Sequence, residues 1–363
     1  MNSREVIDNM LRRKNSDRVG LRDAPWHDTL QRWVKEGYPT DDEGEPVNPT
    51  EHFKFDVWGV GGWFDLMPLR GHSEVLEETD EWTISRNGAG AAFKYWKNKS
   101  GTPEHIDFRM TSREVWERDY RPRLVEFDRD RLDVDGAKKE LEKRTAQGYW
   151  THYGHLFIWE NMRQSMGDVC MYESLIADPE WIHDYNRVHT DMFKTYFGLL
   201  IEEAGKPDGF WFFEDLGYSK GLFCSPKTFE ELIFPYYKEM VDFFHGYDLP
   251  VVLHSCGGVT EAMPLIVDAG FDGLNPMEVK AGCDIFDFAE KYGDQLTFFG
   301  GLDARILESG DRDVIRRGVT DFMTGLKERG ARFVFGSDHS LSTNIAYADF
   351  QYAIDVYREH MMY

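Results

Sequence analysis

Two residues at the end of one apolar segment have side chains that can bind a metal ion. The segment is "VVLHSCGG" at positions 251–258, in which a single residue separates His254 from Cys256. Alternate side chains of an extended strand point to the same face, roughly 6–7 Å apart between Cα atoms. An imidazole nitrogen and a thiolate sulfur at that spacing can bind one tetrahedral zinc ion. The alternative is a hydrogen-bonded histidine beside a small buried cysteine.

A catalytic zinc ion needs a third protein ligand and an open fourth position. His339 follows the apolar segment "FVFGS" near the end of the chain, and we expect it to supply that ligand. An acidic residue that directly follows a strand is commonly a helix N-cap, but in this sequence acidic residues follow several apolar segments in succession. The other polar residues that follow apolar segments are Glu160, Glu214, Asp215, Asn275, Glu278, Asp303 and Asp338.

The elements that must position these residues alternate between strands and helices. We predict helices at 134–147, 179–204, 226–246, 259–269, 284–291, 312–328 and 347–360, with apolar strands between them. This alternation predicts a single α/β domain over residues 1–363, a (β/α)8 TIM barrel in which polar groups meet at the carboxyl ends of the strands. Residues 1–133 are less regular, and "GAGAAFKYWKN" predicts a small N-terminal side hairpin.

Composition excludes several classes of function. The 363 residues are 41% hydrophobic and carry a formal net charge of −23, which disfavours binding to nucleic acid or to an anionic membrane. We find no apolar run of the roughly 20 residues that cross a bilayer, and the first residues do not resemble a signal peptide. The four cysteines form no CxxC pair. We therefore expect a cytoplasmic protein whose cysteines are reduced. The protein can also form oligomers.

"HSCGG", "DGLNPMEVKAGCD" and "FGSDHS" together resemble the uroporphyrinogen decarboxylase-like superfamily. This superfamily contains the porphyrinogen decarboxylases and the zinc-dependent, corrinoid-linked methyltransferases. The resemblance is specific from about residue 160 to residue 363, and it implies the same (β/α)8 barrel. In the methyltransferase branch a His-x-Cys pair and a second cysteine after the last strand hold zinc. His254 and Cys256 match the pair, and His339 lies opposite the second cysteine.

The resemblance implies a zinc-dependent methyltransferase that passes a methyl group from a small methylated substrate to a corrinoid on a separate protein. One thiolate and two neutral imidazoles leave zinc with a net charge of +1, which suits O-demethylation of a methoxylated aromatic. Glu214 and Asp215 would then orient the substrate or act as acid and base, and His339 is a further catalytic candidate. Glu278 would support the metal ligands or bind as an exchangeable fourth ligand.

Two alternatives remain open. The first is decarboxylation of a porphyrinogen or another carboxylated substrate, a branch that keeps a histidine at the position of His339. Only Arg22 stands here in place of that branch's arginine-containing "RQAGRY"-like segment, and Asp56 is the candidate for its key aspartate. The second is a metal-free binding descendant of the fold, since the fold does not settle the function.

Overall fold

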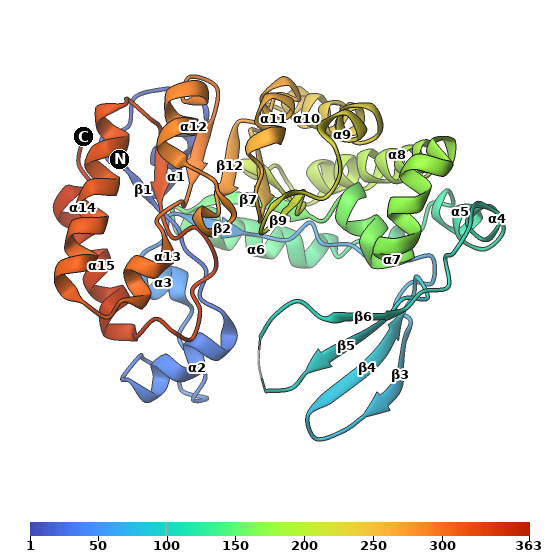
Figure 1. Ribbon diagram of the computed structural model, residues 1–363, viewed down its shortest axis with the longest axis horizontal. Coiled ribbons are helices and arrows are strands. Elements are labelled where there is room, and N and C mark those ends of the chain that lie inside the picture. The colour runs from blue at the N-terminus through green and yellow to red at the C-terminus, as the bar shows by residue number, and fades with distance from the viewer. Residues whose placement is uncertain (99) are drawn as a thin grey trace.

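The computed structural model describes residues 1–98 and 100–363, and eight parallel strands form its central sheet (Figure 1). The sheet order is β1-β14-β13-β12-β11-β8-β7-β2, and the amide of Asp56 donates to the Leu21 carbonyl at 2.8 Å, which brings β2 beside β1. The predicted (β/α)8 barrel is therefore confirmed. Its strands are β1 (Gly20–Leu21), β2 (Val57–Gly59), β7 (Trp150–His155), β8 (Gly209–Phe213), β11 (Val251–Ser255), β12 (Gly273–Pro276), β13 (Thr297–Phe299) and β14 (Phe333–Phe335).

Helices follow the barrel strands along the chain and surround the sheet (Figure 1). Several begin where the sequence places an N-cap: the side chains of Asp178, Ser225 and Asp311 each accept a hydrogen bond from the first turn of their helix. No helix in the described ranges has the length and apolar character needed to cross a membrane. The barrel helices are α6 (Val134–Ala146), α7 (Ile158–Ala177), α8 (Pro179–Glu203), α9 (Pro226–Leu232), α10 (Phe234–Gly246), α11 (Met263–Asp268), α12 (Ile285–Tyr292), α13 (Ala304–Glu308), α14 (Arg312–Glu328) and α15 (Tyr347–His360).

Helix α1 (Ser3–Leu11) closes one end of the barrel. A capping box between Asn2 and Glu5 starts it. Its contacts lie where strands begin, because the Thr297 hydroxyl at the start of β13 donates to the Met10 carbonyl at 2.9 Å. The opening of the barrel is therefore at the carboxyl ends of the strands. The apolar face of α1 packs on the barrel interior, in a cluster of Val6, Ile7, Met10, Leu11, Val57, Trp150, Trp211, Val252, Phe299 and Val334.

The predicted side hairpin belongs to a larger element, which we call the arm sheet. It is antiparallel and has four strands, β3 (Ser73–Glu78), β4 (Trp82–Asn87), β5 (Ala92–Trp96) and β6 (Glu104–Asp107). The turn between β4 and β5 is held by the Asn87 side chain, which accepts hydrogen bonds from the amides of Ala89 and Ala91. Figure 1 shows the arm sheet projecting from the barrel on the same side as α2.

The structure contains several helices that the sequence analysis did not predict, and the longest of them is α7. The sequence analysis missed α7 because "LFIW" has the apolar character of a strand, although β7 ends at His155. The remaining elements, which are short, are α2 (His27–Lys35), α3 (Pro49–Phe53), α4 (Arg113–Val115), a π-turn (Trp116–Tyr120), α5 (Arg121–Leu124), β9 (Gly217–Tyr218), β10 (Gly221–Leu222) and 3₁₀ turns at Arg129–Arg131, Thr260–Ala262 and Val279–Ala281.

Candidate metal centre

His254 and Cys256 lie together at the carboxyl end of β11, as their spacing predicts. The Cys256 Sγ is 3.4 Å from the His254 Nε2, which in turn is 3.7 Å from an Asp215 carboxylate oxygen. One ligand atom from each of these three residues falls within 4.8 Å of the other two. Asp215 reaches this position because β8 pairs with β11, with Phe213 opposite His254. Sulfur, nitrogen and oxygen donors at these distances suit zinc.

A chain of hydrogen bonds fixes the orientation of the His254 ring. The Asn275 amide nitrogen donates to the Phe299 carbonyl at 2.8 Å, so the amide oxygen of Asn275 faces His254. That oxygen lies 2.6 Å from the His254 Nδ1, which must therefore carry the ring proton. The lone pair of Nε2 is left pointing toward Cys256 and Asp215, as metal binding requires.

The two glycines of "HSCGG" allow the loop after β11 to pass close to the loop after β8. Gly257 has a φ of 79°, and a Cβ at that position would lie 2.2 Å from the carbonyl carbon of Gly217. The Gly257 amide donates to Glu278 at 2.9 Å, and the Cys256 amide donates to Asp215 at 2.8 Å. Glu278 thus supports the loop that carries Cys256.

The charges around Cys256 are negative. Burial raises the pKa of the Cys256 thiol well above its usual range, and the carboxylates of Asp215 and Glu278 raise it further. A divalent cation at this position would reverse that effect by attracting the thiolate. With Asp215, His254 and Cys256 as ligands, zinc would have no net charge, whereas the predicted set with His339 leaves +1.

His339 lies in the loop after β14, where it is half-buried and packs edge-to-face on Trp26 with ring centroids 5.8 Å apart. Among the described residues it is not part of the compact group formed by Asp215, His254 and Cys256. It is near enough that its charge lowers the pKa of His254, after the larger effect of burial. The assignment of His339 as a metal ligand therefore stays a prediction.

Glu214 is fully buried beneath the site. Its carboxylate accepts hydrogen bonds from the amides of Phe157 and Trp159 at 2.6 and 2.8 Å, and from the Tyr237 hydroxyl at 2.5 Å. Burial raises the pKa of Glu214 to about 8, while these donors favour the ionised form. Through these contacts Glu214 holds the start of α7, and its catalytic role stays a prediction.

Replacing Glu214 with glutamine should destabilise the protein by about 1–3 kcal/mol, because the amide group would turn a donor toward backbone donors that need an acceptor. Urea unfolding measures the difference. Glu202 on α8 is exposed, so Glu202→Gln is the control and should change stability by less than about 0.5 kcal/mol. A Glu214→Gln variant as stable as the control would contradict the assigned role.

Two polar side chains inside the barrel complete the surroundings. The Arg22 guanidinium stacks on Trp211 with its Cζ 4.9 Å from the ring centroid, and its Nη1 is 3.4 Å from the Asn275 oxygen. No described carboxylate lies within ion-pair distance of Arg22, and burial lowers its pKa. His152 on β7 is buried next to Trp211 at 5.1 Å between ring centroids, and burial lowers its pKa to about 4. Sequence reasoning missed His152, whose only signal was its place inside β7.

Two other residues named from the sequence, Asp338 and Asp303, have structural partners. Asp338 is 1% exposed and accepts hydrogen bonds from the amides of Val279 and Ala304, both at 2.9 Å. Asp303 caps α13, as the common interpretation of such a residue expects. These contacts hold the loops at the carboxyl ends of the strands.

A cavity of about 490 Å³ opens beside the candidate metal centre. We call it the arm cleft, because the arm sheet forms one wall with Phe93, Tyr95 and His105. The barrel forms the other wall, which includes Glu160 and Asp215. Since Asp215 belongs to both the cleft and the metal group, an occupant of the arm cleft can reach the metal position.

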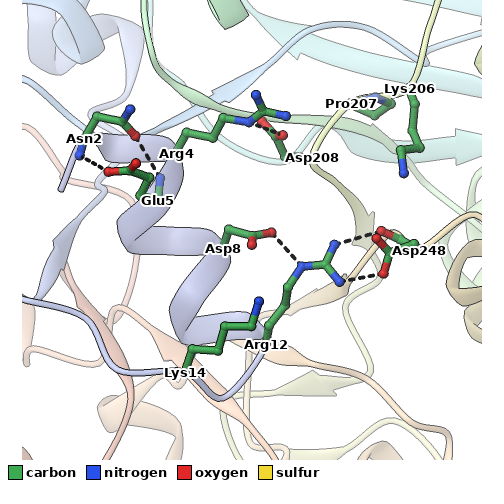
Figure 2. Close-up of a pocket in the computed structure, with 10 residues that line it drawn as sticks. All are labelled: Asn2, Arg4, Glu5, Asp8, Arg12, Lys14, Lys206, Pro207, Asp208 and Asp248. Carbon is green, nitrogen blue, oxygen red and sulfur yellow. Dashed lines mark hydrogen bonds and ion pairs between the residues drawn. The ribbon is translucent and has the colours of Figure 1, made fainter.

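A second cavity of about 600 Å³ lies against α1 at the closed end of the barrel, and Figure 2 shows the residues that line it. Its arginines are paired: Arg4 contacts Asp208 at 2.6 Å, and Arg12 contacts Asp8 at 2.8 Å and Asp248 at 2.6 Å. The cavity shares no lining residue with the candidate metal centre. We therefore place the candidate active site at the open end of the barrel.

Comparisons with known proteins agree with this architecture. Residues 163–360, more than half of the chain, match the family described as uroporphyrinogen decarboxylase (URO-D). A methyltransferase from Methanosarcina mazei is similar in structure, with a TM-score of 0.65, 13% sequence identity and 99% of each chain covered. A family 2 AP endonuclease from Brucella melitensis has a TM-score of only 0.34 at 15% identity, over 60% of this chain and 82% of its own. No curated protein matches the sequence.

Proposed function

This chain belongs to the uroporphyrinogen decarboxylase (URO-D) family, and from that premise we propose that it is a zinc-dependent methyltransferase. It would take a methyl group from a small methylated substrate and transfer it to a corrinoid carried by a separate protein. The observation that carries the proposal is the convergence of His254, Cys256 and Asp215 at the open end of the barrel. The similarity in fold to a Methanosarcina methyltransferase supports it.

The ligand positions suit a catalytic metal. His254, Cys256 and Asp215 would hold zinc, with His339 as a further candidate ligand or as a group that contacts the substrate. When bound, zinc supplies a Lewis acid that polarises the oxygen or sulfur atom to which the methyl group is attached. Asn275 keeps the proton of His254 on Nδ1, and Glu278 holds the loop of Cys256 in place.

The surroundings are compatible with an aromatic substrate such as a methoxylated ring. Trp63 is 55% exposed and stacks on Phe213 with ring centroids 5.5 Å apart, and Phe213 is 5.7 Å from the His254 ring. These aromatic side chains lead from the barrel opening to the metal position. Arg22, which has no carboxylate partner among the described residues, would attract a phenolate or another anionic group of the substrate.

Decarboxylation is the second candidate, because the Arg22 guanidinium, which forms no ion pair in the described part of the chain, also suits a substrate carboxylate. The position of Asp56 argues against decarboxylation. This aspartate lies before β2, at the closed end of the barrel, where Arg18 binds it at 2.6 and 2.8 Å. It therefore cannot contact a substrate at the open end. A metal-free binding protein is the third candidate, and measurement of bound zinc separates it from the first.

The test is to incubate the purified protein with a cob(I)alamin-type corrinoid and a panel of methoxylated aromatics and methylated amines, and in parallel with uroporphyrinogen. Zinc-dependent formation of methylcobalamin is the result we expect. Decarboxylation of the porphyrinogen by protein without metal would overturn the proposal. If the protein binds stoichiometric zinc but catalyses neither reaction, the result would support the metal centre and reject the proposed methyl transfer.

Replacing Asn275 with leucine should weaken zinc binding about 10–100-fold, since the residue that orients a metal-bound histidine has effects of that size. Competition with a chromophoric chelator measures the affinity. Asn275→Asp keeps an acceptor for the His254 Nδ1 proton, and we expect it to retain most of the affinity. If Asn275→Leu binds zinc as tightly as the unaltered protein, His254 is not a ligand in the orientation described.

A further inference from the structure

The arm cleft has a polarity that the proposed methyl transfer does not by itself explain. Its aromatic groups include Phe93 and Tyr95 on the arm sheet and Phe223 on the barrel side. Phe93 is buried, whereas Tyr95, which also lines the cleft, is 47% exposed. A cavity of this size with aromatic walls can accept a small organic molecule.

The positive charge that lines the cleft is already neutralised. The Arg163 guanidinium binds Glu160 at 2.7 Å and Asp168 at 2.9 Å, and it lies 4.5 Å from the Phe223 centroid. One arginine is thus shared between two carboxylates. Burial lowers the pKa of His105, so its ring is neutral at pH 7. Arg22 does not line this cavity.

Among the described residues, two carboxylates that line the cleft each use only one oxygen in a hydrogen bond. Glu160 uses one oxygen for Arg163, and among the described residues its other oxygen accepts no hydrogen bond. Asp215 accepts from the Cys256 amide through one oxygen, which leaves its second oxygen for a metal ion or a substrate. Burial, together with the smaller effects of the nearby charges of Asp215 and Asp168, raises the pKa of Glu160 to about 7, although Arg163 lowers it. A cation in the cleft would relieve this repulsion.

We propose that the arm cleft binds a cationic group, such as a methylated ammonium, at the end of the substrate remote from the metal. The inference rests on the proposed function, because it identifies the substrate as a small methylated compound that carries a positive charge. Aromatic side chains and a carboxylate together are the groups that recognise quaternary ammonium ions. The formal net charge of −23 would also attract such a substrate to the protein.

The experiment compares choline with 3,3-dimethylbutan-1-ol, in which a carbon atom replaces the charged nitrogen and the shape is conserved. Isothermal titration calorimetry on the zinc-loaded protein should show choline binding at least about tenfold more tightly. Equal affinities would overturn the proposal. Tighter binding of 4-methoxybenzoate, a methoxylated anion, than of choline would overturn it as well.

Variants of the cleft residues test which side chains bind the cationic group. Glu160→Gln should reduce the preference for choline to about the level of the neutral alcohol, whereas Glu173→Gln, an exposed glutamate on the same helix, should retain it. Tyr95→Ala gives a second test if Glu160→Gln does not fold, and it should weaken choline binding several-fold. Retention of the full preference by both Glu160→Gln and Tyr95→Ala would place the cation elsewhere.

The outcome is separable from that of the proposed function. Binding of choline needs no methyl transfer, and it is measured apart from zinc content and methylcobalamin formation. A protein that transfers methyl groups from neutral ethers but does not prefer choline would reject this inference alone. A protein that prefers choline but transfers no methyl group would reject the proposed reaction alone.

Discussion

Replacing Cys256 with alanine should weaken zinc binding more than about 100-fold and reduce methyl transfer by at least as much. The thiolate is one of three converging ligand groups, and its loss should exceed the 10–100-fold effect of losing a residue that only orients a ligand. The fold should survive, because Cys256 is only half-buried and the core packs elsewhere. Elemental analysis gives the zinc content, and the absorbance of methylcobalamin gives the rate.

Cys170→Ala is the matched control, since Cys170 is also a free, half-buried cysteine but lies on α7, outside the metal group. It should keep zinc and activity. A thermal melt of each variant separates loss of metal from loss of fold. Full zinc occupancy in Cys256→Ala would show that residues other than Cys256 bind the metal.

Replacing Asp56 with alanine should lower the free energy of unfolding by about 3–5 kcal/mol, the range observed when one partner of a buried ion pair is removed. Asp56 is 1% exposed, and its carboxylate accepts hydrogen bonds from both terminal nitrogens of Arg18 and from the Leu21 amide. Alanine would leave the guanidinium and a buried amide without an acceptor. Chemical denaturation at constant pH measures the change.

The double replacement of Arg18 by methionine and Asp56 by alanine should be less destabilising than the two single changes added together. Asp80 is an exposed aspartate in the turn between β3 and β4, and Asp80→Ala should change stability by less than about 0.5 kcal/mol. If Asp56→Ala lowers the free energy of unfolding by less than about 1 kcal/mol, the contact between β1 and β2 does not depend on this ion pair.

The sequence was sufficient to predict the barrel and to bring together two of the three residues of the candidate metal group, His254 and Cys256. His254 and Cys256 share one strand, so the period of two residues decides that their side chains point the same way. Asp215 was predicted as a catalytic residue, and its place beside His254 depends on the register between β8 and β11. Register between distant strands is not visible in local patterns. For the same reason the position of His339 relative to His254 could not be derived.

The N-terminal part could be predicted less well because its elements depend on partners far along the chain. Strand β1 has only two residues, and it is defined by pairing with Val334 and Phe335. Helix α7 begins at Ile158, where Glu214 satisfies its first amides from more than 50 residues away. The apolar residues just before it are equally compatible with a strand. Tertiary contacts decide such cases.

The pairing of β1 with β14 has a consequence for the order in which the protein can be assembled during translation. The first barrel strand, at Gly20 and Leu21, emerges from the ribosome long before its parallel neighbour at Val334 and Phe335. At 5–20 residues per second, synthesis of the intervening chain takes roughly 15–65 s. Throughout that time the apolar face of α1, with Val6, Ile7 and Met10, has no finished barrel to cover. The ring therefore cannot close before β14 has been synthesised, and nascent chains of this protein are suited to recognition by chaperones that bind exposed apolar helices.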